Sequence, residues 1–230
     1  MAYDIKIKDN YFTLRPSIRR KHISIGIDDE SGTFYIAYPA AMAESALLSA
    51  IAEDTDKIVN RLRTKTPEIK KHTYAEGELF FLRGTEYPLR YSDMRQNALD
   101  FDGHAFFVSP FSASYASPLF EKWYSRALYY DLKTIMPLWT KRISVCPVNV
   151  SVKMVRSIWG SCSAGGNITF STRLVMVPPP LLEYVVVHEL CHMKNMNHSK
   201  QFWGEVGEYI PDYRAKRSSL KKDGMKYRWQ

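Results

Sequence analysis

The sequence predicts an α+β fold, with an antiparallel, strand-rich portion over residues 1–115 followed by a helix-rich portion over residues 116–230. Short runs of alternating apolar and polar residues dominate the first portion, and this period is typical of half-buried strands. Longer stretches with helical spacing dominate the second portion. Strands and helices are grouped rather than strictly alternating, which favours α+β over a doubly wound parallel sheet.

The first strands are predicted from four alternating runs that turn residues separate, at residues 3–9, 11–17, 22–28 and 32–39. Their order suggests an antiparallel meander. The segment from Ala40 to Arg63 contains no Gly or Pro, and its apolar residues recur at helical spacing. We therefore expect a single helix there.

A second group of strands is expected at residues 77–94 and 104–110, before a long helix that Pro118 introduces. Leu128, Leu132, Ile135 and Trp139 follow at spacings of four, three and four, so they share one helical face. This helix is long enough to support the second half of the chain.

The last third of the chain is predicted to begin with strands at residues 148–160 and 167–177, joined by the turn-forming "SAGGN". Helices follow at residues 181–193, at residues 199–210 with Ser199 as the N-cap, and behind Pro211. The strand that starts "NITFSTRLV" is expected to be an edge strand beside the first of these helices. An edge offers unpaired backbone groups to an extended peptide.

Composition limits the compartment and the class of protein. The three cysteines, Cys146, Cys162 and Cys191, are odd in number and form no C-x-x-C pair, so a disulfide framework is not indicated. The first residues lack the apolar run of a signal peptide, and no stretch approaches the roughly eighteen apolar residues of a membrane span. We expect a cytoplasmic protein without a membrane partner.

The chain carries a net charge of +8, from 32 basic and 24 acidic residues, and much of the excess lies in "RPSIRRKH" and "YRAKRSSLKKDGMKYRW". A basic C-terminal segment leaves nucleic acid open as a partner. Charge runs are more often solvated faces, however, and no nucleic-acid-binding motif accompanies these residues.

The stretch "VVVHELCHMKNMNHSKQFW" at residues 185–203 contains an H-E-x-x-H motif. Residues four apart on a helix differ by about 40° in direction, so His188 and His192 can bind one metal ion. Glu189 points near the same face without being placed as a ligand, which suits a general base acting on a metal-bound water. Zinc with three protein ligands and one open position is the expected catalytic arrangement.

His198 can be the third ligand only if the chain turns back after His192, because a continuous helix would place it roughly 15 Å further along the axis. Asn195 and Asn197 provide residues that tolerate the left-handed conformation found at helix ends. We therefore expect a bend at these asparagines. The motif alone also occurs by chance, and a metal site that only holds the fold remains an alternative.

The chain resembles the YgjP-like metallopeptidase family, a relative of the SprT-like and, more distantly, the thermolysin-type zinc peptidases. The resemblance rests on "WGSCS", "NITFSTRLVMVPP", the histidine stretch and "PDYRAKRSSLK", in the family's order over residues 148–222. It implies a zincin-like C-terminal portion in which His188, His192 and His198 bind Zn2+ and Glu189 is the catalytic base. Ile158 stands where many relatives carry a basic residue.

The predicted function is a zinc metallopeptidase that acts on peptide or protein substrates. Tyr213 is a further candidate, as a phenol donor to the oxyanion, although a core tyrosine is the simpler explanation of its position. Two alternatives stay open: a zinc amidase acting on a non-protein amide, and a non-catalytic, basic zinc protein that binds nucleic acid. A Cys162 nucleophile is less consistent with the histidine arrangement.

Overall fold

The computed structural model describes residues 3–8, 10–27, 34–52, 54–65, 72–93, 97–155, 158–224 and 226–227. The chain divides into two compact units, residues 1–69 and 70–230. The predicted start of the peptidase portion at residue 116 falls within the second unit. It stays a prediction about function, because compactness alone does not say where a peptidase begins.

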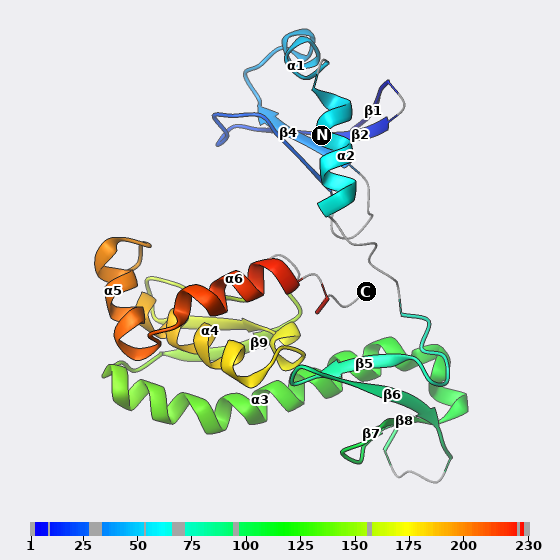
Figure 1. Ribbon diagram of the computed structural model, residues 1–230, viewed down its shortest axis with the longest axis vertical. Coiled ribbons are helices and arrows are strands. Elements are labelled where there is room, and N and C mark those ends of the chain that lie inside the picture. The colour runs from blue at the N-terminus through cyan, green and yellow to red at the C-terminus, as the bar shows by residue number, and fades with distance from the viewer. Residues whose placement is uncertain are drawn as a thin grey trace. The chain divides into compact units, whose positions relative to one another are not determined.

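The first unit is a four-stranded sheet with two helices (Figure 1). Its elements are β1 (Tyr3–Ile7), β2 (Asn10–Ser17), β3 (Ser24–Ile27), β4 (Phe34–Pro39), α1 (Glu44–Ile51) and α2 (Thr55–Lys65). Phe12 and Leu14 are buried on alternate positions of β2, as a strand with one covered face requires. They form a core with Ile36 of β4 and Leu47 of α1.

Two predictions for this unit are wrong. The sheet has the order β1-β2-β4-β3, and β2 pairs with β4 in parallel, so it is not an antiparallel meander. The chain passes from β2 to the far edge, and β4 then returns into the position between them. The single predicted helix is divided into α1 and α2. The buried Thr55 hydroxyl donates to the carbonyl of Ile51 at this division, and such side-chain bonds compete with helical backbone pairing.

The second unit contains two further sheets and the long helix α3 (Ala116–Ile143). The first sheet has the order β5-β6-β8-β7, from β5 (Leu79–Leu82), β6 (Thr85–Tyr91), β7 (Leu99–Phe101) and β8 (Phe106–Val108). The short 3₁₀ helix η1 (Pro110–Tyr115) leads into α3. Positive φ angles at Arg83 and Gly84 close the β5–β6 hairpin.

The remaining elements include the histidine-bearing helix. They are β9 (Asn149–Lys153), β10 (Gly160–Cys162), β11 (Asn167–Ser171), the 3₁₀ helix η2 (Thr172–Val175), α4 (Pro179–His192), α5 (Lys200–Tyr209) and α6 (Tyr213–Asp223). The 3₁₀ helix replaces the end of the strand expected over residues 167–177. The hydroxyl of Ser171 accepts a hydrogen bond from the Arg173 N–H there, and this bond starts the turn.

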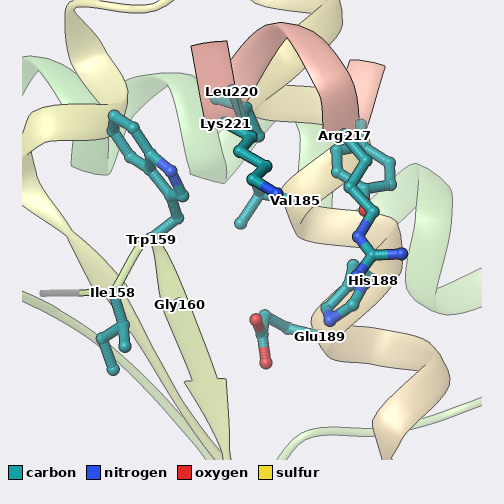
Figure 2. Close-up of a pocket in the computed structure, with 10 residues that line it drawn as sticks. Ile158, Trp159, Gly160, Val185, His188, Glu189, Arg217, Leu220 and Lys221 are labelled. Carbon is teal, nitrogen blue, oxygen red and sulfur yellow. The ribbon is translucent and has the colours of Figure 1, made fainter. Parts of the chain in front are cut away.

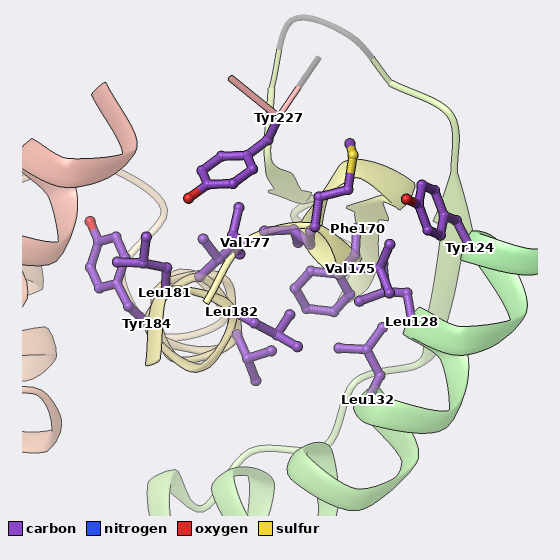
Figure 3. Close-up of a cluster of buried hydrophobic side chains, with 14 of the residues drawn as sticks. Tyr124, Leu128, Leu132, Phe170, Val175, Val177, Leu181, Leu182, Tyr184 and Tyr227 are labelled. Carbon is purple, nitrogen blue, oxygen red and sulfur yellow. The ribbon is translucent and has the colours of Figure 1, made fainter. Parts of the chain in front are cut away.

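One core joins the sheets of the second unit through α3. Phe120, near the start of α3, stacks on Phe80 of β5 with 4.2 Å between ring centroids. Further along the same helix, Leu128 and Leu132 lie in the cluster that contains Phe170 of β11 and Leu182 of α4 (Figure 3). The same helix therefore covers one sheet and supports the helix that carries the histidines.

The strand beside the histidine helix is β10, and not β11 as predicted. In the order β10-β11-β9, β11 is central and is paired on both sides, whereas β10 pairs only with β11. The predicted edge strand beside the histidine-bearing helix exists, but "WGSCS" supplies it. No helix in the described part of the chain is long and apolar enough to span a membrane.

Candidate active site

Helix α4 brings the first two histidines of the motif together. His188 and His192 are one helical turn apart, and their Nε2 atoms lie 3.2 Å from each other. The helix is buried around most of its surface by apolar residues of the second unit's core. Packing of the whole helix thus fixes the direction in which both rings point.

His198 joins them because the chain turns back between α4 and α5, as the sequence predicts. Its Nε2 lies 3.2 Å from that of His188. The asparagines act differently from the prediction, because Asn195 and Asn197 are not among the described residues with a positive φ angle. Instead, the Asn197 Oδ1 accepts from the Ser199 N–H, and the Ser199 hydroxyl accepts from the Phe202 N–H to start α5. The turn is built by side-chain hydrogen bonds.

A network behind His192 holds this turn. The His192 Nδ1–H donates to the carbonyl oxygen of Asn195 at 3.0 Å, which leaves Nε2 with a free lone pair. The Asn195 amide nitrogen in turn donates to Glu205 of α5 at 2.8 Å, and the Lys194 ammonium lies 2.9 Å from the other Glu205 oxygen. Glu205 therefore orients His192 through Asn195. No sequence pattern indicates this role, because the contact spans ten residues across a turn.

Aromatic rings of α5 pack against the imidazoles. Phe202 is fully buried and stacks on His192, with 4.3 Å between ring centroids. Trp203 stacks on His198 at 5.4 Å. The His188 Nδ1 is buried and has no hydrogen-bond partner among the described residues, so packing alone positions this ring. Phe202 and Trp203 thus pack against the histidine cluster from the side of α5.

The three histidines fit a metal ion. The ligand atoms that they offer all lie within 4.8 Å of one another. In a tetrahedral zinc site with Zn–N distances of about 2.05 Å, two nitrogens are about 3.3 Å apart, close to the two Nε2 separations here. Converging lone pairs repel each other unless a cation or a proton lies between them. His188, His192 and His198 together could therefore hold one metal ion.

Glu189 lies toward β10 and lines the same pocket as His188. A Cβ atom on Gly160 would lie 2.8 Å from both the Cγ and the Oε1 of Glu189. Glycine is therefore needed at this position for the strand to approach the carboxylate so closely. No described residue donates a hydrogen bond to Glu189, and its side chain is almost completely buried.

Burial shifts the pKa values of these groups. Desolvation raises the pKa of Glu189 to about 7. It also lowers the pKa of His188 to about 3, with further lowering from His192, His198 and Arg217. The pKa of His198 is lowered by burial first, and then by His192 and Arg217. A neutral imidazole is the form that binds a metal. The lowered pKa values of His188 and His198 therefore favour the form of these rings that can act as a ligand.

A pocket of about 420 Å³ opens beside Glu189 and His188 (Figure 2). Trp159 and Gly160 line it from the β10 side, and Arg217 and Lys221 line it from α6. Sequence reasoning does not find these two α6 residues, although their i, i+4 spacing on a basic helix is visible. Trp159 is partly buried against the core of the second unit and also forms a wall of the pocket.

Tyr213 lies at the start of α6, on the aromatic layer beside the histidines. Its ring stacks on Trp203 at 5.2 Å, and its hydroxyl accepts from the Arg214 Nε at 3.3 Å. Tyr213 is not one of the described residues that line the pocket. Its role in catalysis stays a prediction.

Comparison with known proteins decides the family. The sequence model of the YgjP-like metallopeptidase domain matches residues 21–223, which is most of the chain. The chain belongs to the YgjP-like metallopeptidase family. The resemblance inferred from the C-terminal motifs is thereby confirmed, and the YgjP-like match also includes much of the first unit, where the sequence offered no motif.

A solved structure that is similar to part of this YgjP-like chain is the metallopeptidase zymogen abylysin of Pyrococcus abyssi. The match has a TM-score of 0.37 and 21% identity, and it covers 43% of this chain and 98% of that chain. A likeness of this size does not establish a shared fold. No curated protein matches the sequence.

Proposed function

We propose that the protein is a zinc-dependent peptidase in which His188, His192 and His198 bind the metal and Glu189 is the catalytic base. One observation carries this proposal: the ligand nitrogens of three imidazoles lie within 4.8 Å of one another, and a buried carboxylate directly follows the first of them on α4. Membership of a metallopeptidase family supports it, since peptidases act on peptide and protein substrates.

Zinc suits this set of ligands better than a hard cation. Neutral imidazole nitrogens are common zinc ligands, whereas magnesium and calcium prefer oxygen atoms. When bound, zinc would polarise the substrate carbonyl and make a water molecule more acidic. Three protein ligands leave a fourth position for solvent or substrate.

Glu189 moves the protons in this proposal. Its carboxylate takes a proton from the attacking water and passes it to the nitrogen of the leaving amine. A carboxylate that burial has partly desolvated is a stronger base than one in water, and burial raises the pKa of Glu189 to about 7. A bound dication would lower that pKa again and favour the ionised form.

Strand β10 can hold the substrate backbone. The Ser171 N–H of β11 donates to the carbonyl oxygen of Trp159, so these two residues form a hydrogen-bonded pair. In an antiparallel ladder such pairs alternate, so the backbone N–H and C=O groups of Gly160 and Cys162 point away from β11. An extended peptide can add to these groups as another strand. Gly160 lies against Glu189, so such a peptide would pass the catalytic base.

The test is a pair of substitutions on purified, zinc-loaded protein. Glu189→Gln should retain zinc and lose at least roughly a hundredfold in kcat, as expected for a lost general base. His192→Ala should lose both zinc and hydrolysis. Glu208→Gln, on the exposed face of α5, is the matched control and should resemble the wild type. Normal turnover by the Glu189→Gln protein on any cleavable peptide contradicts the proposal.

We also propose Tyr213 as a hydrogen-bond donor to the oxyanion. Its hydroxyl oxygen accepts a hydrogen bond from Arg214, which leaves the phenol hydrogen available to donate. The stack of Tyr213 on Trp203, and of Trp203 on His198, places it in the layer that supports the third ligand. Tyr213→Phe should lower kcat at least about tenfold without loss of zinc; an unchanged kcat removes this role.

A further inference from the structure

The pocket beside Glu189 is charged on one side and apolar on the other. Val185 of α4, Leu220 of α6 and the indole of Trp159 supply apolar surface. Arg217 and Lys221 are one turn apart on α6, and both side chains extend over the pocket in Figure 2. A group that fills this pocket therefore meets an apolar wall and two cationic ends.

Arg217 and Lys221 do not form ion pairs with carboxylates in the described part of the chain. By contrast, Lys216 on the same helix pairs with Asp212, and Lys226 pairs with Asp223. Glu189 is the only carboxylate among the described residues that line the pocket. The pocket therefore carries an excess of positive charge close to the proposed catalytic base.

The charged side of the pocket is held in place by packing. The Arg217 guanidinium lies over the ring of Trp203, at 4.8 Å from its centroid. On the opposite side, the buried Arg173 lies over Trp159 at 4.3 Å. It donates to the carbonyl oxygen of Gly224, the C-cap of α6, and to that of Tyr227 beyond the helix. One arginine thus fixes both the Trp159 wall and the end of the helix that carries Lys221.

We propose that this pocket binds a carboxylate group of the substrate next to the scissile bond, with Arg217 and Lys221 as its specificity determinants. The carboxylate can belong to an acidic side chain or to a free C-terminus. Its position follows from the pocket's lining, because His188 and Glu189 belong both to this pocket and to the proposed reaction site. The inference rests on the proposed peptidase function and deepens it by naming the substrate class.

The first test compares quenched fluorescent peptides that differ at one position flanking the cleaved bond. One arm carries Glu, Gln or Lys at that position with an amidated C-terminus. The other arm carries a neutral residue and ends in either a free carboxylate or an amide. We expect kcat/KM to be roughly tenfold higher for the carboxylate member of at least one pair, as a charge-assisted hydrogen bond would give. Equal values in both arms, or a preference for Lys, overturn the inference.

The second test uses charge reversals at neighbouring positions of α6. Lys221→Glu should reduce the ratio of kcat/KM for the Glu peptide to kcat/KM for the Gln peptide to one or below. Lys221→Gln should give an intermediate ratio. Lys222→Glu changes the net charge equally but alters an exposed residue that does not line the pocket, so its ratio should match the wild type. Because the readout is a ratio for one enzyme, a general loss of activity cancels. An unchanged ratio in Lys221→Glu overturns the assignment.

Binding to the Glu189→Gln protein separates this inference from the proposed function. Fluorescence anisotropy of labelled Glu and Gln peptides measures selection without hydrolysis. If the wild type cleaves no peptide but the Glu189→Gln protein binds the Glu peptide roughly tenfold more tightly, the peptidase proposal fails and the pocket assignment stands. Cleavage without discrimination between the Glu and Gln peptides contradicts the pocket assignment alone.

Binding to duplex DNA is a further outcome. The pocket assignment also fails if Lys221→Glu loses binding to duplex DNA while the Glu/Gln ratio and the free-carboxylate/amide ratio stay unchanged.

Discussion

The two four-stranded sheets of the molecule have the same strand order but different partners. The first, β1-β2-β4-β3, shares a core with α1 and α2, the helices that follow it in the chain. The second, β5-β6-β8-β7, shares a core with α3, whose other half lies against α4. In both sheets a hairpin pairs in parallel with the last strand, and the third strand occupies the far edge.

The difference shows that strand order alone says little about function. The buried residues of the first sheet's hydrophobic cluster all lie within residues 7–59. The second sheet belongs to a cluster that continues through α3 into α4 and α5. Mechanical support for the histidines therefore comes from the second sheet and its helix. Substitutions that destabilise one sheet at a time test this conclusion.

The largest effect is expected from Phe120→Ala. Phe120 is fully buried and stacks on Phe80, so its loss should destabilise the second unit by about 3–5 kcal/mol. All five tryptophans follow residue 70, so tryptophan fluorescence during urea unfolding reports on this unit. Leu138→Ala, at an exposed position on the same helix, is the control and should leave the midpoint almost unchanged.

Leu47→Ala is the matching change in the first unit. Leu47 is also fully buried, and its truncation should cost about 2–5 kcal/mol in the unit that α1 helps to form. Circular dichroism should show an earlier transition, while the tryptophan transition and zinc affinity stay as in the wild type. A parallel fall in zinc affinity would show that the two units depend on each other.

Gly160→Ala should act on chemistry rather than on stability. The added methyl group needs the space that Glu189 occupies, so the carboxylate must move from its place beside the histidines. We expect kcat to fall about 10- to 100-fold, equivalent to about 1.4–2.7 kcal/mol, because a small displacement of a catalytic group is costly. Zinc content should not change. Gly204→Ala is the control, since no described atom other than its chain neighbours and the adjacent backbone of α5 lies within 4 Å of the place that its methyl group would take. Wild-type kcat in Gly160→Ala would contradict the geometry.

The smallest effect is expected from Glu205→Gln. This substitution removes the charge that attracts Lys194 and weakens the contact to Asn195, whose carbonyl orients His192. Zinc affinity, measured by competition with a chelator, should fall about tenfold. The Glu208→Gln protein should bind zinc normally. Unchanged affinity in Glu205→Gln would mean that packing by Phe202 is sufficient to hold the ring.

Local rules are enough to predict the elements of the site from the sequence. The i, i+4 spacing of His188 and His192 requires one helical face, and His198 can reach them only through a turn. The expectation of a turn after His192 is correct, but the expected mechanism is not. Asparagine can shape a turn through its side chain as well as through a left-handed backbone, and the sequence does not distinguish these.

Non-local pairing lies beyond the sequence. "NITFS" and "WGSCS" are both short strands, and their patterns do not tell which one is central, because this depends on β9 pairing from the other side. Arg217 and Lys221 are visible only as part of a basic run. Their place over the pocket follows from how α6 packs, and charge patterns along one chain do not contain that information.

The most direct test of the proposed metal site is X-ray absorption spectroscopy of the purified protein after zinc loading, with metal content measured on the same sample. We predict one zinc ion per chain, bound by three imidazole nitrogens at about 2.0–2.1 Å with one further position filled by solvent. The spectrum of His198→Ala should lose one imidazole. A sulfur ligand, a fourth protein nitrogen, or a bound zinc that does not respond to His198→Ala would contradict a catalytic site built from these three histidines.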